Sequence, residues 1–220
     1  MSNYKTIVVD ATSGTDVGSV DNFSFNHTVG SGNEGILIFI YSGRANPNPT
    51  AVTFNGVALT ASLVTTKFDT CFVEFWYLLK PATGTHAIAV TLSEADNNRH
   101  CCGAVSFFNV EQTDPIKVSD EQGGVATSFS NPFTSTLDGQ YAIEGQSNTQ
   151  SQAGTVVAGQ TLIKARSSAN SGGISYKSLG TSGAETVGWT GFAGGAAYKS
   201  GLVVIQPAEE VGGSFLYNFI

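Results

Sequence analysis

The densest set of reactive side chains lies between residues 94 and 102, where two carboxylates, an imidazole and two thiols stand within nine residues. Zinc sites usually separate their cysteines by about two to four residues, whereas Cys101 and Cys102 are adjacent. Calcium could take oxygens at alternate positions here, but Arg99 replaces the glycine of a calcium loop and Val105 replaces its last acidic ligand. We therefore expect a polar loop that holds no metal or cofactor.

Three histidines could act as general bases: His27, His86 and His100. One of them could activate a Cys101 nucleophile, because folding brings distant residues together. The alternative is a buried Cys101 that packs as a small hydrophobe, with alternation placing Cys102 on the opposite face of the strand. A disulfide from Cys71 to either cysteine is a further alternative. The signature motifs of serine hydrolases, P-loop proteins and zinc proteases are absent from the sequence, and we expect no enzymatic activity.

Aromatic side chains offer a second kind of chemistry, the stacking of sugar rings. Glu74 precedes Trp76 by two residues, which could pair a carboxylate with an aromatic platform, and the alternative is a sheet edge or an ion pair. Trp189 and Tyr198 could form an exposed stacking surface, and the alternative is that they are core aromatics. Glycosidase chemistry needs two carboxylates in opposed environments, and the sequence nominates no such pair.

The elements that would position these residues are β-strands. Apolar residues recur at every second position in short runs, which Gly, Asn, Pro and Ser separate. The expected strands cover residues 6–9, 22–29, 35–41, 52–59, 70–79, 85–92, 101–108, 141–146, 161–165, 174–179, 187–190 and 202–205. Residues 110–124 are expected to be a polar connection, and Asn55-Gly56 predicts a type I′ hairpin turn.

This pattern predicts an all-β fold, a two-sheet antiparallel sandwich of the jelly-roll or Greek-key type. We expect residues 1–208 to form one domain and residues 209–220 to form a tail. After a Gly-Gly pair the tail carries five large apolar residues: Phe215, Leu216, Tyr217, Phe219 and Ile220. They are expected to contact a neighbouring subunit, and the alternative is a last strand that folds back on its own sheet.

Charge limits the partners of the chain. Ten Lys and Arg oppose seventeen Asp and Glu, for a net charge of −7, so binding to nucleic acid or to an anionic membrane is not expected. Charged residues make up only 12% of the chain, against about 25% in typical domains, so the surface must be polar but uncharged. We expect neither a signal peptide nor a membrane span, and the three cysteines suit synthesis in a reducing cytosol.

Several motifs resemble a β-sandwich family of phage virion proteins and of bacterial surface or secreted proteins. The resemblance is close over residues 20–118 and loose beyond them, and it is carried by Ala51–Thr60, Val73–Leu78, Pro81–His86, Gly103–Phe107 and Ser200–Val204. These motifs are structural, so the resemblance implies a fold and a setting but no catalytic residue.

The lack of a secretion signal or an attached enzyme domain favours the virion members of that family. The resemblance then implies a capsid-surface, decoration, tail or fibre component that is made in the host cytoplasm. Such a protein would form homo-oligomers and contact other virion proteins. The alternative function is a carbohydrate-binding or adhesion module that binds a glycan.

Overall fold

The computed structural model describes residues 3–18, 22–44, 47–94, 100–167, 171–192 and 194–210. Within these ranges every regular element is a β-strand, and all strand pairs are antiparallel. The expected all-β antiparallel sandwich is confirmed. In the described part of the chain, no helix is long and apolar enough to cross a membrane.

Seventeen strands are formed by the described residues. In the first half they are β1 (Val8–Val17), β2 (Asn22–Val29), β3 (Ile36–Arg44), β4 (Pro49–Phe54), β5 (Val57–Ala58), β6 (Thr60–Val64), β7 (Cys71–Leu79), β8 (Gly84–Leu92) and β9 (His100–Phe108). In the second half they are β10 (Ile116–Ala126), β11 (Ser128–Ser135), β12 (Tyr141–Asn148), β13 (Thr155–Val156), β14 (Gln160–Arg166), β15 (Ser171–Ser178), β16 (Gly183–Thr190) and β17 (Ala196–Ile205).

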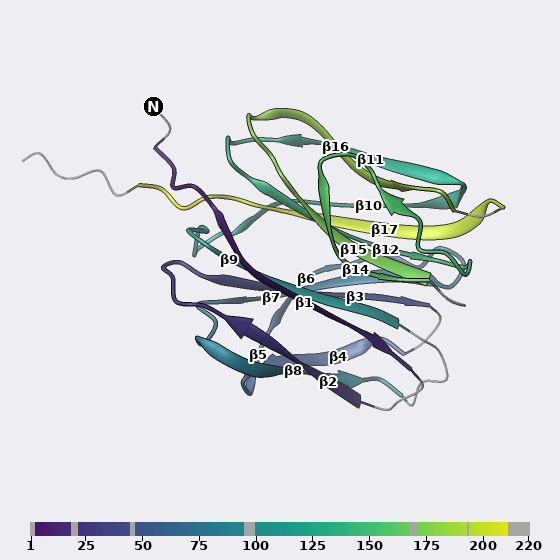
Figure 1. The fold of residues 1–220 in the computed structure, drawn as a ribbon, viewed down its shortest axis with the longest axis horizontal. Helices are drawn as coiled ribbons and strands as arrows, with labels where there is room; N and C mark the ends of the chain where they lie inside the picture. Colours follow the sequence, from purple (N-terminus) through teal and green to yellow (C-terminus); the bar gives the residue numbers. More distant parts are fainter. Residues whose placement is uncertain are drawn as a thin grey trace, which may run out of the picture.

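The strands form four stacked layers rather than the two that the sequence suggested (Figure 1). One outer sheet has the order β2-β8-β4-β5, and the inner sheet beside it has the order β1-β9-β3-β7-β6. The second inner sheet, β10-β17-β12-β15-β14, is covered by the second outer sheet, β11-β16-β13. Each half of the chain is thus a two-sheet sandwich, and the two sandwiches pack through their inner sheets.

The expected polar connection at 110–124 is wrong from residue 116 on, because β10 occupies this part, and β11, which follows it, was not expected either. Strand β10 is an edge strand without a fully buried side chain, so its sequence lacks apolar alternation. Strand β11 does alternate, but two of its buried positions are the polar residues Asn131 and Ser135. These two strands complete the second sandwich.

The two halves repeat one strand order. The inner sheets match strand by strand from β1/β10 to β6/β14, and β2-β8-β4 matches β11-β16-β13 in the outer sheets. In both halves the last strand pairs with the first, and most successive strands change sheet, which is jelly-roll connectivity. The repeat extends to irregularities, because β1 and β10 each bulge near their start and β6 and β14 each bulge in the middle.

These four bulged strands are the edges of the two inner sheets. The extra residues are Asp10 in β1, Lys117 in β10, Ser62 in β6 and Ile163 in β14. A bulge increases the local twist and interrupts regular pairing, so it protects an edge strand from pairing with another chain. The inner sheets are therefore poorly suited to extension by a neighbouring strand.

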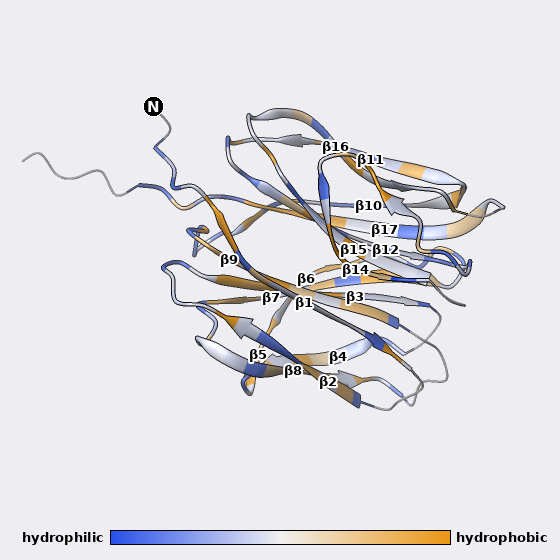
Figure 2. Cartoon of the chain, in the orientation of Figure 1, coloured by the Kyte–Doolittle hydropathy of each residue, from blue (hydrophilic) through white to orange (hydrophobic). Residues whose placement is uncertain are grey.

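One of the two large core clusters lies between the two inner sheets and includes Ile40, Phe75, Ile143 and Ile174. Figure 2 shows hydrophobic segments running through these middle layers. In the first half Ile40 pairs with Gly103 and Phe75, and in the second half Gly145 pairs in the same way with Gly201 and Ile174. These pairings define which positions of the two halves are equivalent.

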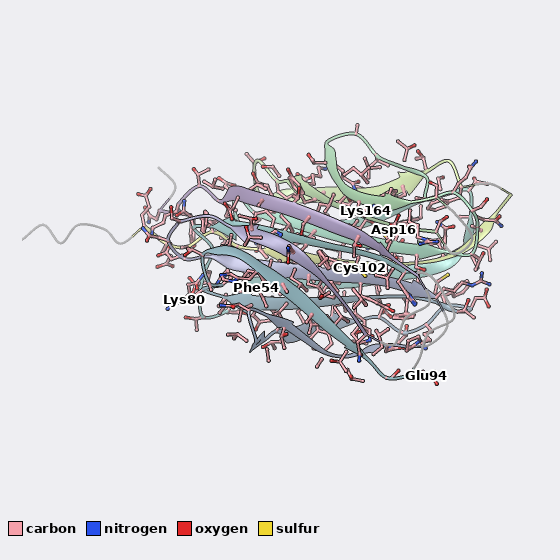
Figure 3. The ribbon with its side chains drawn as sticks, turned by 60° about the horizontal axis from the view of Figure 1, so that its bottom comes forward. Asp16, Phe54, Lys80, Glu94, Cys102 and Lys164 are labelled. Carbon is pink, nitrogen blue, oxygen red and sulfur yellow. The ribbon has the colours of Figure 1, made fainter. Side chains whose placement is uncertain are left out.

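Contacts between the halves are reciprocal. A Cβ atom on Gly103 would lie 3.0 Å from Ile174 Cδ1, and one on Gly201 would lie 3.1 Å from the ring of Phe75, the equivalent of Ile174. The edges follow the same rule, since Asp16 on β1 pairs with Lys164 on β14 at 3.4 Å (Figure 3) and Glu121 on β10 accepts from the backbone N–H of Thr66 after β6. The halves pack like two subunits around a two-fold axis.

Candidate functional site

Only part of the nominated cluster at 94–102 lies within the described structure. Residues 95–99 lie outside the described ranges, and His100, Cys101 and Cys102 are buried at the start of β9. Burial raises the pKa of Cys101 to about 12, so its thiol stays protonated and is a poor nucleophile. Among the described residues, no group of three or more His, Cys, Asp or Glu side chains could hold a metal ion.

The two adjacent cysteines point to opposite faces of β9, as alternation predicts. Cys101 packs between the two inner sheets, and Cys102 packs between the sheets of the first sandwich. A Cys101–His27 dyad is not formed, because the His27 ring lies beside Phe54, inside the first sandwich. Cys71, Cys101 and Cys102 are all free thiols.

Of the two alternatives for Trp189 and Tyr198, the structure shows buried core aromatics. Trp189 has no exposed surface, its ring covers Gly173, and its indole Nε1 donates to Glu144 Oε2 at 3.1 Å. Tyr198 is 7% exposed, and its ring stacks on Phe129 with centroids 4.4 Å apart. The faces of both rings pack against other residues inside the second sandwich, so neither ring is available to stack on a sugar.

Glu74 is also an interior residue rather than a member of a sheet edge. Its carboxylate accepts from Asn48 Nδ2 at 2.8 Å and from Trp76 Nε1 at 3.2 Å. Burial raises its pKa, and these two donors and the charge of Lys67 oppose that change. The Glu74 and Trp76 pair is thus an internal hydrogen bond that satisfies a buried acid.

A hydrogen-bonded chain of four residues ties β1, β2 and β9 together in the first sandwich. His27 Nδ1 lies 2.8 Å from Ser13 Oγ, and His27 Nε2 lies 3.0 Å from Ser106 Oγ. Ser106 donates its only hydroxyl proton to Asp10 Oδ2 at 2.7 Å, so it must accept from Nε2–H. This fixes the tautomer of His27 and leaves Nδ1 as the acceptor for Ser13.

The order of this chain is that of a serine, a base and an orienting group, but the base is weak. Burial lowers the pKa of His27 to about 4, and the nearby Asp10 opposes that change. A general base works best when its pKa is near the working pH. The arrangement therefore suits a structural link better than nucleophilic catalysis. The sequence did not reveal it, because the four residues are spread over about a hundred positions.

The second sandwich contains a different polar cluster around Glu144. Its Oε2 accepts from Gln160 Nε2 at 2.9 Å as well as from Trp189, and its Oε1 accepts from Ser200 Oγ at 3.2 Å. Burial raises the pKa of Glu144 to about 8, and the three hydrogen bonds oppose that change. At neutral pH the folded protein therefore holds this carboxyl mostly protonated.

In the described strands of the two outer sheets, no charged side chain lies on the outward face. On the sheet β2-β8-β4 the outward residues are Asn22, Ser24, Asn26, Thr28, Thr85, Ala87, Ala89, Thr91, Ala51 and Thr53. On the sheet β11-β16-β13 they include Ser128, Ser130, Pro132, Thr134, Ala184, Thr186, Thr190 and Thr155. Glu185 is the charged residue in these strands, and it is directed to an ion pair with Lys177 at 2.7 Å. Each face is thus covered by small side chains, many of which can form hydrogen bonds.

A pocket of about 340 Å³ lies where the N-terminal segment meets the chain after β17. Its lining residues are Tyr4, Glu111, Lys117, Thr136, Leu137, Gln206, Pro207 and Glu209. The pocket brings together no nucleophile and base, and the lysine in its wall is paired with Asp114. The proposed tail contacts at Phe215, Leu216, Tyr217, Phe219 and Ile220 follow this region and lie outside the described residues.

Comparison with known proteins gives no family to which the chain can be assigned. No family model matches the sequence, and no curated protein matches it.

Proposed function

We propose that this chain is a structural protein of a virion and acts through contacts between subunits. The observation that carries the proposal is the pair of uncharged outer faces on opposite sides of the four-layer stack. The chain has a net charge of −7, so two copies repel each other least when they meet through surfaces without charge. Small side chains allow the sheets to approach closely, and hydroxyl and amide groups can pair across the contact.

The interior supports the same reading. The reactive groups of both sandwiches are engaged in hydrogen bonds that hold strands together, as in the chain through His27 and the cluster around Glu144. A virion setting comes from the family resemblance of residues 20–118. Bulged inner edges direct subunit contacts away from strand addition and toward the faces and the tail.

The test is the mass and shape of the protein as isolated. We expect native mass spectrometry and negative-stain electron microscopy to show a symmetric oligomer or a filament. Ala89→Lys places a charge in the middle of one outer face and should dissociate the assembly, whereas Thr12→Lys on the exposed side of β1 should not. A monomer at every concentration would refute the proposal.

The alternative function is binding of a glycan, but the two aromatic residues nominated for it, Trp189 and Tyr198, are buried. Any glycan site would have to use the Asn, Ser and Thr side chains of the outer faces. A glycan array distinguishes the two functions. If the protein is monomeric and binds a specific glycan, and if Ala89→Lys abolishes that binding, the result would support a glycan-binding module rather than a virion subunit.

A further inference from the structure

The repeat allows each half to serve as a reference for the other. Phe39 on β3 pairs with Trp76 and Ala104, and Glu144 on β12 pairs with the corresponding residues of β15 and β17. In the outer sheets Phe25 on β2 pairs with Ile88, and Asn131 on β11 pairs with the corresponding Val187. Two phenylalanines of the first sandwich are therefore replaced by a glutamate and an asparagine in the second.

In the first sandwich these two positions face each other. The rings of Phe25 and Phe39 pack across the gap between the sheets with their centroids 6.3 Å apart. From the equivalence of the two halves, we infer that Asn131 faces Glu144 in the second sandwich. Both side chains are shorter than phenylalanine, and both bring hydrogen-bonding atoms into a layer that is apolar in the first half.

Among the described residues, Asn131 differs from its polar neighbours because its side chain has no hydrogen-bond partner. It is 0% exposed, and neither its Nδ2 nor its Oδ1 has a hydrogen-bond partner among the described residues. The Glu144 oxygens opposite it are each within 3.2 Å of a donor. A buried amide without partners costs a protein far more stability than an apolar side chain of the same shape. Such a residue indicates a partner that is not part of the chain.

We propose that the interior of the second sandwich is a binding site for a water molecule held between the Asn131 amide and the Glu144 carboxyl group. Water is the smallest species that both donates and accepts, and the Asn131 amide offers one group of each kind. Buried waters typically make about three hydrogen bonds to polar groups that the protein leaves unsatisfied. The inference concerns the interior and does not rest on the proposed function.

A crystal structure at a resolution that shows ordered solvent tests the site directly in the full chain. The expected result is a water within hydrogen-bond distance of both the Asn131 amide and the Glu144 carboxyl group. An Asn131 amide that bonds directly to protein atoms, or a site without solvent density, would overturn the proposal.

The stability of Asn131→Leu is a second test, because the substitution should change stability in opposite directions with and without the bound water. If the water is present, Asn131→Leu removes its partner and should lower the folding equilibrium constant roughly tenfold, measured by chemical denaturation. If Asn131 is truly unpaired, the same change should raise that constant. Phe25→Leu at the equivalent position is the matched control, and the crystal structure decides the question should Asn131→Leu not fold.

Discussion

Glu144 shows how one residue couples this fold to pH. Its pKa is raised to about 8 by burial, whereas the unfolded chain releases the same proton near the ordinary value of 4.5. Between these two values the folded state binds one proton more than the unfolded state. Stability must then fall as the pH rises through this window and must become constant above it.

Replacement of Glu144 by glutamine should remove this dependence. Glu144→Gln keeps a side chain of the same shape that cannot ionise, so its folding equilibrium constant relative to the unmodified protein should rise by up to about tenfold per pH unit from pH 4.5 to 8. Urea denaturation at several pH values measures the ratio. A ratio that does not change with pH would show that Glu144 ionises in the fold as it does in the unfolded chain.

Gly201 is a position at which the two halves of the chain approach each other closely. A Cβ atom there would lie 2.9 Å from Thr65 Cγ2 and 3.1 Å from the Phe75 ring, so Gly201→Ala should destabilise the protein by about 1–3 kcal/mol. Gly180, which has no atom within 4 Å of such a Cβ, provides the control Gly180→Ala. Equal melting temperatures for the two variants would mean that the inner sheets are not in close contact.

At the scale of elements, the turn between β4 and β5 is the clearest match between sequence and structure. Asn55 and Gly56 have φ angles of 50° and 77°, as a type I′ turn requires, and Phe54 pairs with Val57. Gly56→Ala introduces a Cβ into the left-handed region and should cost about 1 kcal/mol. Thermal unfolding measures this loss against Gly18→Ala, where the φ angle is not left-handed; identical melting points would contradict the turn assignment.

Strands could be predicted where bulky apolar residues fill them, and they were missed where side chains are exposed, half-buried or, as at Asn131 in β11, polar at a buried position. Strand β7 is bulky on both faces and was evident, but β10 exposes or half-buries every side chain and reads as a loop. Whether a candidate site residue is buried or exposed was also difficult to predict from the sequence. Aromatic rings such as Trp189 have equal sequence signatures inside and outside a sandwich, and only the packing of sheets decides between them.

The repeat could not be detected from the sequence because most equivalent positions carry different residues in the two halves. Tyr77/Tyr176, Gly84/Gly183 and Gly103/Gly201 are identical, but Phe39/Glu144 and Phe25/Asn131 are opposite in character. Strand order, bulge positions and reciprocal contacts are properties of the backbone, and many side chains can satisfy them. Turns and aromatic strands mark the sequence of the first half, whereas the second half has polar and small residues at many of the equivalent positions.

At the scale of the whole molecule, His27 in one sandwich and Glu144 in the other have opposite effects on how stability depends on pH. Burial lowers the pKa of His27 to about 4 from an ordinary value of 6.5, so between these values the unfolded state binds the extra proton and stability falls as the pH falls. Glu144 in the other sandwich acts in the reverse direction from pH 4.5 to 8. The two slopes cancel between about pH 4.5 and 6.5, where both windows overlap.

Variants should separate the two contributions. In Glu144→Gln the remaining His27 makes the protein lose stability as the pH falls from 6.5 to 4, and in His27→Gln the remaining Glu144 makes it lose stability as the pH rises from 4.5 to 8. The raised pKa of Glu74 acts in all forms and cancels when variants are compared. If the double variant shows the additive profile, measured by urea denaturation, the two sandwiches titrate independently; a profile that is not additive would show that protonation in one half alters the packing of the other.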